Sequence, residues 1–195
     1  MNILEKYITD HNKFVVLIMG IPGTSKTIFA KKLLHNLNEC LTDDHKIKLI
    51  RLKDYLIKDK YTVIEVENVK FNIYDSSENI DLDKLNEDVK KDKRIIIVGN
   101  QIDATKINFE YNLAYYFDTS YINYKNYIID KQIIKDVDEK TMDIYVYKVF
   151  KLNAEELKKT VHFKIFNIKK DVKYLDVYDK VVESIISYIS KKLYK

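Results

Sequence analysis

Glycine and proline, the residues that most often interrupt helices and strands, are concentrated in one short loop of this chain. Of its 195 residues three are glycine and one is proline, and that proline lies with two of the glycines between Gly20 and Gly23. An apolar run of strand length, Phe14–Met19, comes directly before the loop and is typical of a strand buried on both faces. After the loop, apolar residues recur at helical spacing through about Asn38. The sequence therefore predicts a buried strand, a tight loop and a helix, in that order.

Residues 20–27 read GIPGTSKT and follow the phosphate-binding loop pattern G-x-x-x-x-G-K-[ST] at every fixed position but one. In such a loop, backbone N–H groups turn inward around phosphate oxygens, and the helix N-terminus adds a partial positive charge. Lys26 is expected to reach the β and γ phosphates, and the Thr27 hydroxyl is expected to ligate Mg²⁺. The predicted ligand is ATP with Mg²⁺, held by Gly20, Gly23, Thr24, Ser25, Lys26 and Thr27.

The one departure is Ser25, which stands where the pattern has its second glycine. That position is expected to need a left-handed backbone, which costs a residue other than glycine about 1–2 kcal/mol. Contacts with the ligand can offset this cost, so we expect ATP binding to be weakened rather than abolished. The alternative interpretation is a strand–loop–helix corner in which Lys26 and Thr27 are incidental.

The rest of the chain alternates strands with helices, which predicts an α/β fold with a mainly parallel sheet flanked by helices. Further strands are expected at residues 46–52, 94–98, 108–117 and 161–168, and helices at 82–91, 121–135 and 178–193. Residues 61–73, with a tight-turn candidate at Glu67–Asn68, favour a hairpin. Residues 141–152 fit a helix or a strand equally. Nothing in the composition suggests a linker, so a single domain over residues 1–195 is expected.

Composition limits the classes of partner. A formal charge of +4 with interspersed acidic residues gives no basic stripe and argues against a nucleic-acid partner. Cys40 is the only cysteine and the four histidines lack ligand-like spacing, so neither disulfides nor a cysteine or histidine metal site is expected. No apolar run approaches the roughly 20 residues that span a bilayer, and the N-terminus is unlike a signal peptide. We therefore expect a cytoplasmic protein without a membrane partner.

The strand–loop–helix unit resembles the P-loop kinases of small metabolites, and the order of later signals is most similar to the uridine kinase group of nucleoside kinases. In that group the second strand ends in an acidic residue followed closely by an aromatic one, and Asp54 and Tyr55 match this here. An aspartate then precedes a short helix and a strand, and Asp75 stands in that order before residues 94–98. The resemblance covers about residues 13–120.

This resemblance implies a three-layer P-loop NTPase-like fold in which the hairpin at 61–73 and a lid helix at 121–135 are insertions. It also implies an ATP-dependent kinase whose small-molecule acceptor is a nucleoside. Asp54, at the carboxyl end of a strand, would join Lys26 as a catalytic residue by accepting the proton of the attacking hydroxyl or by holding Mg²⁺ through water. The alternative for Asp54 is a solvated loop acid or a helix cap.

Three further residues are implied as acceptor ligands. Asp75 resembles the residue that holds the sugar hydroxyls of the acceptor, although an Asx-turn fits Asp75 equally. Tyr55 and Tyr74 could stack on a base, or serve packing, since the chain has 16 tyrosines.

Two departures from the family pattern keep other functions open. The strand at 94–98 ends in Val98, where the family usually has an acidic residue, and Asp54 or Asp103 would have to replace it. The expected lid, residues 121–135, contains Lys125, Lys131 and Lys135 but no arginine. The alternatives are a catalytically impaired nucleotide-binding protein with a regulatory or structural role and a nucleoside monophosphate kinase. The sequence also leaves homo-oligomer formation open.

Overall fold

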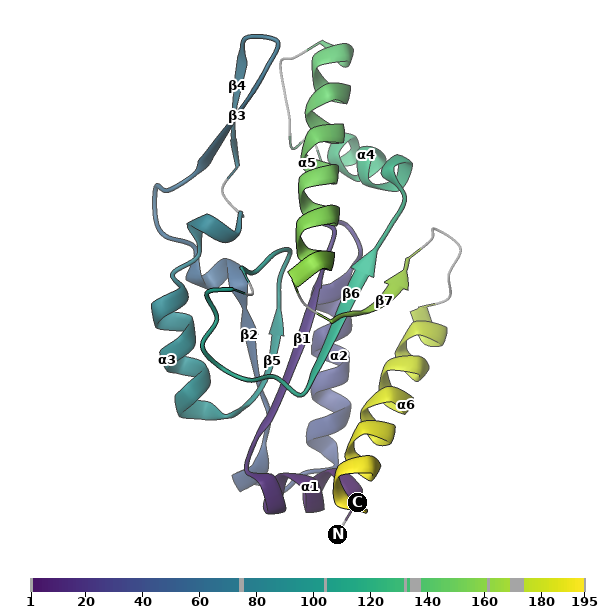
Figure 1. Ribbon diagram of the computed structural model, residues 1–195. Coiled ribbons are helices and arrows are strands. Elements are labelled where there is room, and N and C mark those ends of the chain that lie inside the picture. The colour runs from purple at the N-terminus through teal and green to yellow at the C-terminus, as the bar shows by residue number, and fades with distance from the viewer. Residues whose placement is uncertain are drawn as a thin grey trace.

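The computed structural model describes residues 2–73, 76–103, 105–131, 133, 138–160, 162–168 and 174–194. Their largest sheet has five strands in the order β2-β5-β1-β6-β7, and each neighbouring pair is parallel. These strands are β1 (Phe14–Gly20), β2 (Lys48–Arg51), β5 (Arg94–Val98), β6 (Leu113–Asp118) and β7 (Lys164–Asn167). Their carboxyl ends therefore share one edge, which is the upper edge in Figure 1. The predicted α/β fold with a mainly parallel sheet is confirmed.

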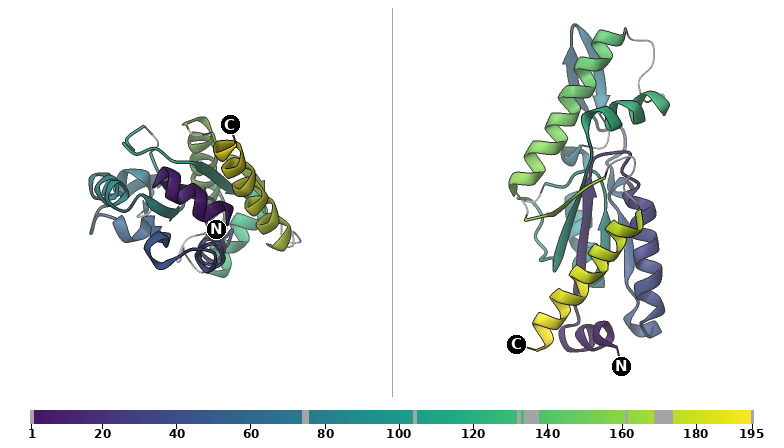
Figure 2. Two further views of the ribbon diagram at one scale, coloured as in Figure 1. Left: turned by 90° about the horizontal axis from the view of Figure 1, so that it is seen from below. Right: turned by 90° about the vertical axis from the view of Figure 1, so that its right-hand side faces the viewer.

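Helices cover both faces of this sheet. They are α1 (Ile3–His11), α2 (Lys26–Glu39), α3 (Leu82–Asp92), α4 (Tyr121–Asp130), α5 (Glu139–Thr160) and α6 (Tyr174–Leu193). Successive residues of a strand face opposite sides of the sheet. Leu17 of β1 lies in a buried cluster with residues of α3, α4 and α5, whereas Ile18 lies in a second cluster with residues of α1, α2 and α6. The molecule thus has three layers, and Figure 2 shows α2 and α5 on opposite sides of the sheet.

The central strand explains why the loop after it is well fixed. Every residue of β1 is buried, and β1 pairs with β5 on one side and with β6 on the other. Burying a large apolar side chain contributes about 1.5–3 kcal/mol. The loop that follows β1 therefore begins from a fully buried strand that is paired on both sides.

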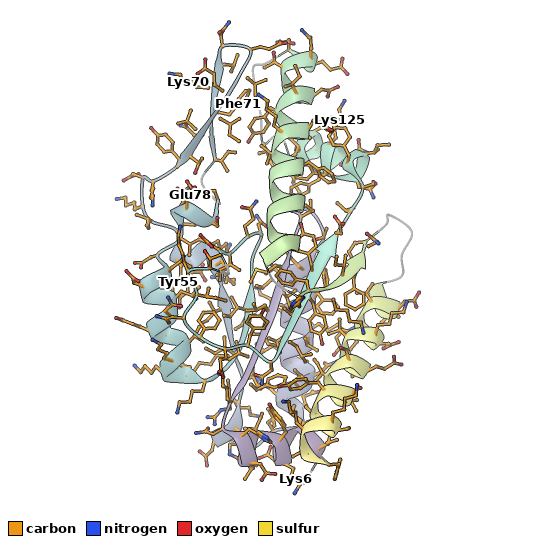
Figure 3. The ribbon with its side chains drawn as sticks, in the orientation of Figure 1. Lys6, Tyr55, Lys70, Phe71, Glu78 and Lys125 are labelled. Carbon is orange, nitrogen blue, oxygen red and sulfur yellow. The ribbon has the colours of Figure 1, made fainter. Side chains whose placement is uncertain are left out.

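A hairpin stands beyond the carboxyl edge of the sheet, beside α5 (Figure 1). It consists of β3 (Thr62–Val66) and β4 (Val69–Ile73). Its two turn residues, Glu67 and Asn68, have φ of 47° and 67°, the left-handed pair that suits a two-residue hairpin turn. Phe71 points from β4 toward α5 (Figure 3), and its ring centroid lies 4.3 Å from that of Tyr145. The predicted hairpin and its turn are confirmed.

Some elements differ from the sequence prediction. Residues 141–152, which fitted either state, lie within the helix α5. The strand predicted from residue 108 begins only at Leu113, because the Asn108 amide donates to the side chain of Asn86 on α3, at 3.0 Å, rather than to a neighbouring strand. Helix α1 was not predicted. None of the helices within the described ranges has the length and apolar character of a membrane span.

Candidate phosphate-binding site

The loop between β1 and α2 lies at the carboxyl edge of the sheet, where the chain leaves the central strand. In open α/β sheets this edge is where ligands bind. Gly20 has φ of 150°, and a Cβ at this position would lie 2.2 Å from the carbonyl oxygen of Phe117 on β6. Gly23 has φ of 86°, and a Cβ there would lie 2.7 Å from the ring of Tyr127 on α4. Both glycines are therefore required by backbone conformation and by close neighbours.

Ser25 has the left-handed backbone that the sequence predicts, with φ of 54° and ψ of 19°. It is the N-cap of α2, yet its side chain makes no capping hydrogen bond. The conformation therefore strains Ser25 without the usual compensation from a cap. The left-handed turn at Ser25 is thus kept at a cost in stability.

We expect Ser25→Gly to raise the free energy of unfolding by about 1 kcal/mol, because relief of left-handed strain outweighs the extra flexibility of glycine in the unfolded chain. ATP should bind at least as tightly as to the original chain. Chemical denaturation and calorimetric ATP titration measure the two effects. Lys93→Gly is the matched control, since Lys93 has φ of 57° at the C-cap of α3 and should show the gain in stability alone. A loss of ATP affinity in Ser25→Gly would contradict this account of Ser25.

Lys26 is directed into the loop rather than into solvent. Its side chain is buried, and its amine donates a hydrogen bond to the Ile21 carbonyl at 3.0 Å. The Thr24 hydroxyl donates to the same carbonyl at 2.8 Å. A buried ammonium group is stable only where it meets polar partners. The loop therefore holds a positive charge at the N-terminus of α2, where the helix already favours anions.

Three cavities meet around this loop. A small cavity of about 180 Å³ is lined by Lys26 and Thr27 and by the ends of β2 and β5, including Arg51, Lys53 and Asn100. A large cavity of about 820 Å³ lies between the loop, the hairpin, α4 and α5. A third cavity of about 520 Å³, here named the β6-side cavity, is lined by Gly23, Thr24, Thr119, Asn123, Lys131 and Ile168, among others. The large cavity shares lining residues with each of the other two, so the three cavities adjoin one another around the loop.

Comparison with known proteins gives structural matches only. No family model matches the sequence, and no curated protein matches it. A solved structure from a Silicibacter species, described as a candidate kinase of a fructose transport system, matches with a TM-score of 0.56 at 9% identity, over 85% of this chain and 98% of that one. At this low identity the match shows that this chain shares the fold of that structure. An uncharacterized protein from Eubacterium ventriosum has a TM-score of 0.50 at 17% identity, over 90% of this chain and 99% of its own.

Two of the other predicted site residues, Asp54 and Tyr55, line none of the three cavities around the loop. Asp54 is in a 3₁₀ turn (Leu52–Tyr55) after β2, where its carboxylate accepts a hydrogen bond from Arg51 Nε at 2.8 Å. Tyr55 lies on the α3 side (Figure 3), and its hydroxyl donates to Asp88 at 2.7 Å. Burial, together with this bond, raises the pKa of Tyr55. Tyr74 and Asp75 lie outside the described residues.

The family pattern places an acidic residue that helps hold the metal at the end of β5, where this chain has Val98. Val98 lines the small cavity without supplying a carboxylate. Asp103 is engaged nearby by Thr105 and Lys106, and the hydrogen bond from the Thr105 side chain lowers the pKa of Asp103. No group of three or more His, Cys, Asp or Glu side chains suited to a metal occurs in the described residues. Thr27 lines both the small and the large cavity, and its hydroxyl suits a Mg²⁺ ion whose other ligands are water and phosphate oxygens.

The predicted lid corresponds to α4 and the residue after it. Lys131 lines both the large cavity and the β6-side cavity. Lys125 instead pairs with Asp143 of α5, at 2.6 Å, and ties the two helices together (Figure 3). Lys135 lies outside the described residues. Sequence reasoning missed Arg51 and Lys53 as cavity residues, although both flank the strand end from which Asp54 was chosen.

Proposed function

We propose that this protein is a kinase that transfers the γ-phosphoryl group of ATP to a small acceptor. The observation that carries the proposal is the buried amine of Lys26 inside a glycine loop at the N-terminus of α2, with cavities on both sides. Backbone amides and a lysine in this arrangement neutralise phosphate charge. Little covalent chemistry is then required of the protein, because positioning and charge stabilisation supply most of the catalysis in phosphoryl transfer.

In this proposal the donor occupies the loop and the β6-side cavity. Its phosphates lie along the loop amides and Lys26, and its nucleoside part lies among polar side chains that include Thr119 and Asn123. Mg²⁺, when bound, neutralises charge on the β and γ phosphates, and Thr27 would be its protein ligand.

The acceptor then occupies the small and large cavities. Its attacking oxygen forms a bond to the γ phosphorus while the bond from that phosphorus to the β–γ bridging oxygen breaks. ADP leaves with the electron pair, and any proton on the attacking oxygen passes to water. A nucleoside and a nucleoside monophosphate are the two proposed acceptor classes. The roles of Asp54 as base or metal ligand, and of Asp75, Tyr55 and Tyr74 as acceptor ligands, stay predictions.

One observation favours a second candidate, a nucleotide-binding protein without turnover. Among their described lining residues, neither the small nor the large cavity has a carboxylate that would support the metal at Thr27 or accept a proton. Such a protein would bind ATP as a regulatory or structural ligand.

A turnover assay with Mg·ATP decides between the two candidates. The acceptor pool contains nucleosides, nucleoside monophosphates, sugars, sugar phosphates and hydroxy acids, and mass spectrometry identifies any product that is 80 mass units heavier, which is the mass of one transferred phosphoryl group. One phosphorylated product establishes the kinase. Clear ATP binding without any product favours the second candidate, and absence of both contradicts the two proposals together.

A further inference from the structure

The charged side chains that line the small and large cavities have one sign. The small cavity is lined by Lys26, Arg51 and Lys53, and the large cavity by Lys26, Lys53 and Lys131. No carboxylate lines either one within the described residues. The whole chain is nearly balanced, with 34 basic and 30 acidic residues. The excess of positive charge is therefore a local property of these two cavities.

Arg51 is held in a pose suited to an anion. Asp54 accepts a hydrogen bond from its Nε at 2.8 Å, and the two terminal nitrogens have no partner in the described part of the chain. A guanidinium group binds carboxylates and phosphates through parallel hydrogen bonds from two of its nitrogens. Asp54 therefore acts as a positioning residue, because it fixes one edge of the guanidinium group and leaves the other donors available.

Lys53 adds a second available charge. It lines both cavities, and the described residues include no hydrogen-bonding or ion-pairing partner for its amine. Arg51 and Lys53 thus bring two positive charges to the small cavity, which Lys26 also lines. Asp54 offsets part of the charge of Arg51 through the 2.8 Å ion pair, and the positive charge that remains in the cluster favours an anion among its members.

The phosphates of the proposed donor, ATP, do not need the positive charges of Arg51 and Lys53. Neither Arg51 nor Lys53 lines the β6-side cavity, whereas Lys131 does. The donor phosphates are already matched by the loop amides, the N-terminus of α2 and Lys26. Arg51, at the end of β2, and Lys53, in the turn after it, line the small cavity, which is proposed for the acceptor.

We propose that the acceptor carries an anionic group, a phosphate or a carboxylate, that binds Arg51 and Lys53 in the small cavity. This inference rests on the proposed kinase function and deepens it. It favours a nucleoside monophosphate or another acidic metabolite over a neutral nucleoside. The two negative partners, donor and acceptor, are then held apart by the cations between them, so that the acceptor oxygen approaches the γ phosphorus without charge repulsion.

The test compares acceptors and variants in steady-state kinetics. The protein should phosphorylate acceptors from the phosphate-bearing or the carboxylate-bearing set, and which set reacts identifies the anion. In Arg51→Gln the acceptor KM should rise about 10- to 100-fold, the loss expected for charge-assisted hydrogen bonds, while the KM for ATP changes less than about threefold. Asp54→Asn should raise the acceptor KM by a smaller factor and change kcat little, whereas a catalytic base would lower kcat.

Arg94→Gln is the matched control, because Arg94 is the only other arginine in the chain. Arg94 bonds to Asn12 and to the Asp44 carbonyl and lines none of the three cavities. Its replacement should leave the acceptor KM unchanged. Equal or faster turnover of a neutral nucleoside, with no effect of Arg51→Gln, would overturn the inference and leave the kinase function standing.

A binding measurement covers the case in which no acceptor reacts and the kinase function fails. Inorganic phosphate is titrated into the protein saturated with a non-hydrolysable ATP analogue. Binding that is lost in Arg51→Gln and kept in Arg94→Gln supports the anion site. Absence of phosphate binding, or binding that survives in Arg51→Gln, overturns it.

Discussion

Replacing Lys26 with alanine should lower turnover about 100- to 1,000-fold, which is typical of removing one preorganised donor to developing charge. ATP affinity should fall as well, because the buried amine is the side-chain cation within the loop. The fold should persist, since the Ile21 carbonyl keeps its hydrogen bond from the Thr24 hydroxyl. Calorimetric ATP titration, single-turnover kinetics and thermal unfolding of the same preparation measure these three effects.

Lys31→Ala is the control for this experiment. Lys31 lies on the same helix, is exposed and lines none of the three cavities. Its replacement removes the same charge from α2 without touching the loop, so turnover and ATP affinity should stay unchanged. Unchanged ATP affinity in Lys26→Ala would mean that the nucleotide binds elsewhere and would remove the basis of the proposed function.

The loop was predictable because its determinants are local. A buried strand, glycine at two positions and a helix fix the path of the chain within a dozen residues, and even the left-handed backbone of Ser25 follows from its place in the pattern. The hairpin turn at Glu67–Asn68 was found for the same reason. Short-range steric rules decide such features before any long-range contact forms.

The side chains around the cavities were harder to predict because they depend on tertiary contacts. Asp54 was chosen from its place at a strand end, but a 3₁₀ turn directs its carboxylate to Arg51. Tyr55 was a candidate for stacking, yet it packs on α3 and bonds Asp88. Residues 141–152 were ambiguous because their aromatic and β-branched side chains, such as Tyr145 and Val149, suit either state, and their burial at helical spacing in α5 appears only in the structure.

Gly20→Ala should cause the largest loss of stability among single changes in the loop, at least about 3 kcal/mol. The added Cβ would lie 2.2 Å from the Phe117 carbonyl oxygen, which also accepts the Ile21 amide hydrogen bond at 3.0 Å. Strand β1 would have to move away from β6 at the residue where the loop begins. Chemical denaturation measures the loss, and ATP titration at low temperature shows whether binding fails with it.

Gly99→Ala provides the matched control, because Gly99 directly follows the neighbouring strand β5 but its added Cβ would meet a side chain, Leu52 Cδ1, at 2.4 Å. A clash with a side chain is relieved by truncating it, so Leu52→Ala should recover part of the stability lost in Gly99→Ala. A clash with a backbone carbonyl group remains when the side chain of that residue is truncated. Phe117→Ala should therefore recover none of the stability lost in Gly20→Ala. Recovery of stability when Phe117→Ala is combined with Gly20→Ala would show that β1 and β6 can shift to accommodate the added Cβ. The requirement for Gly20 would then come from phosphate binding rather than from the sheet.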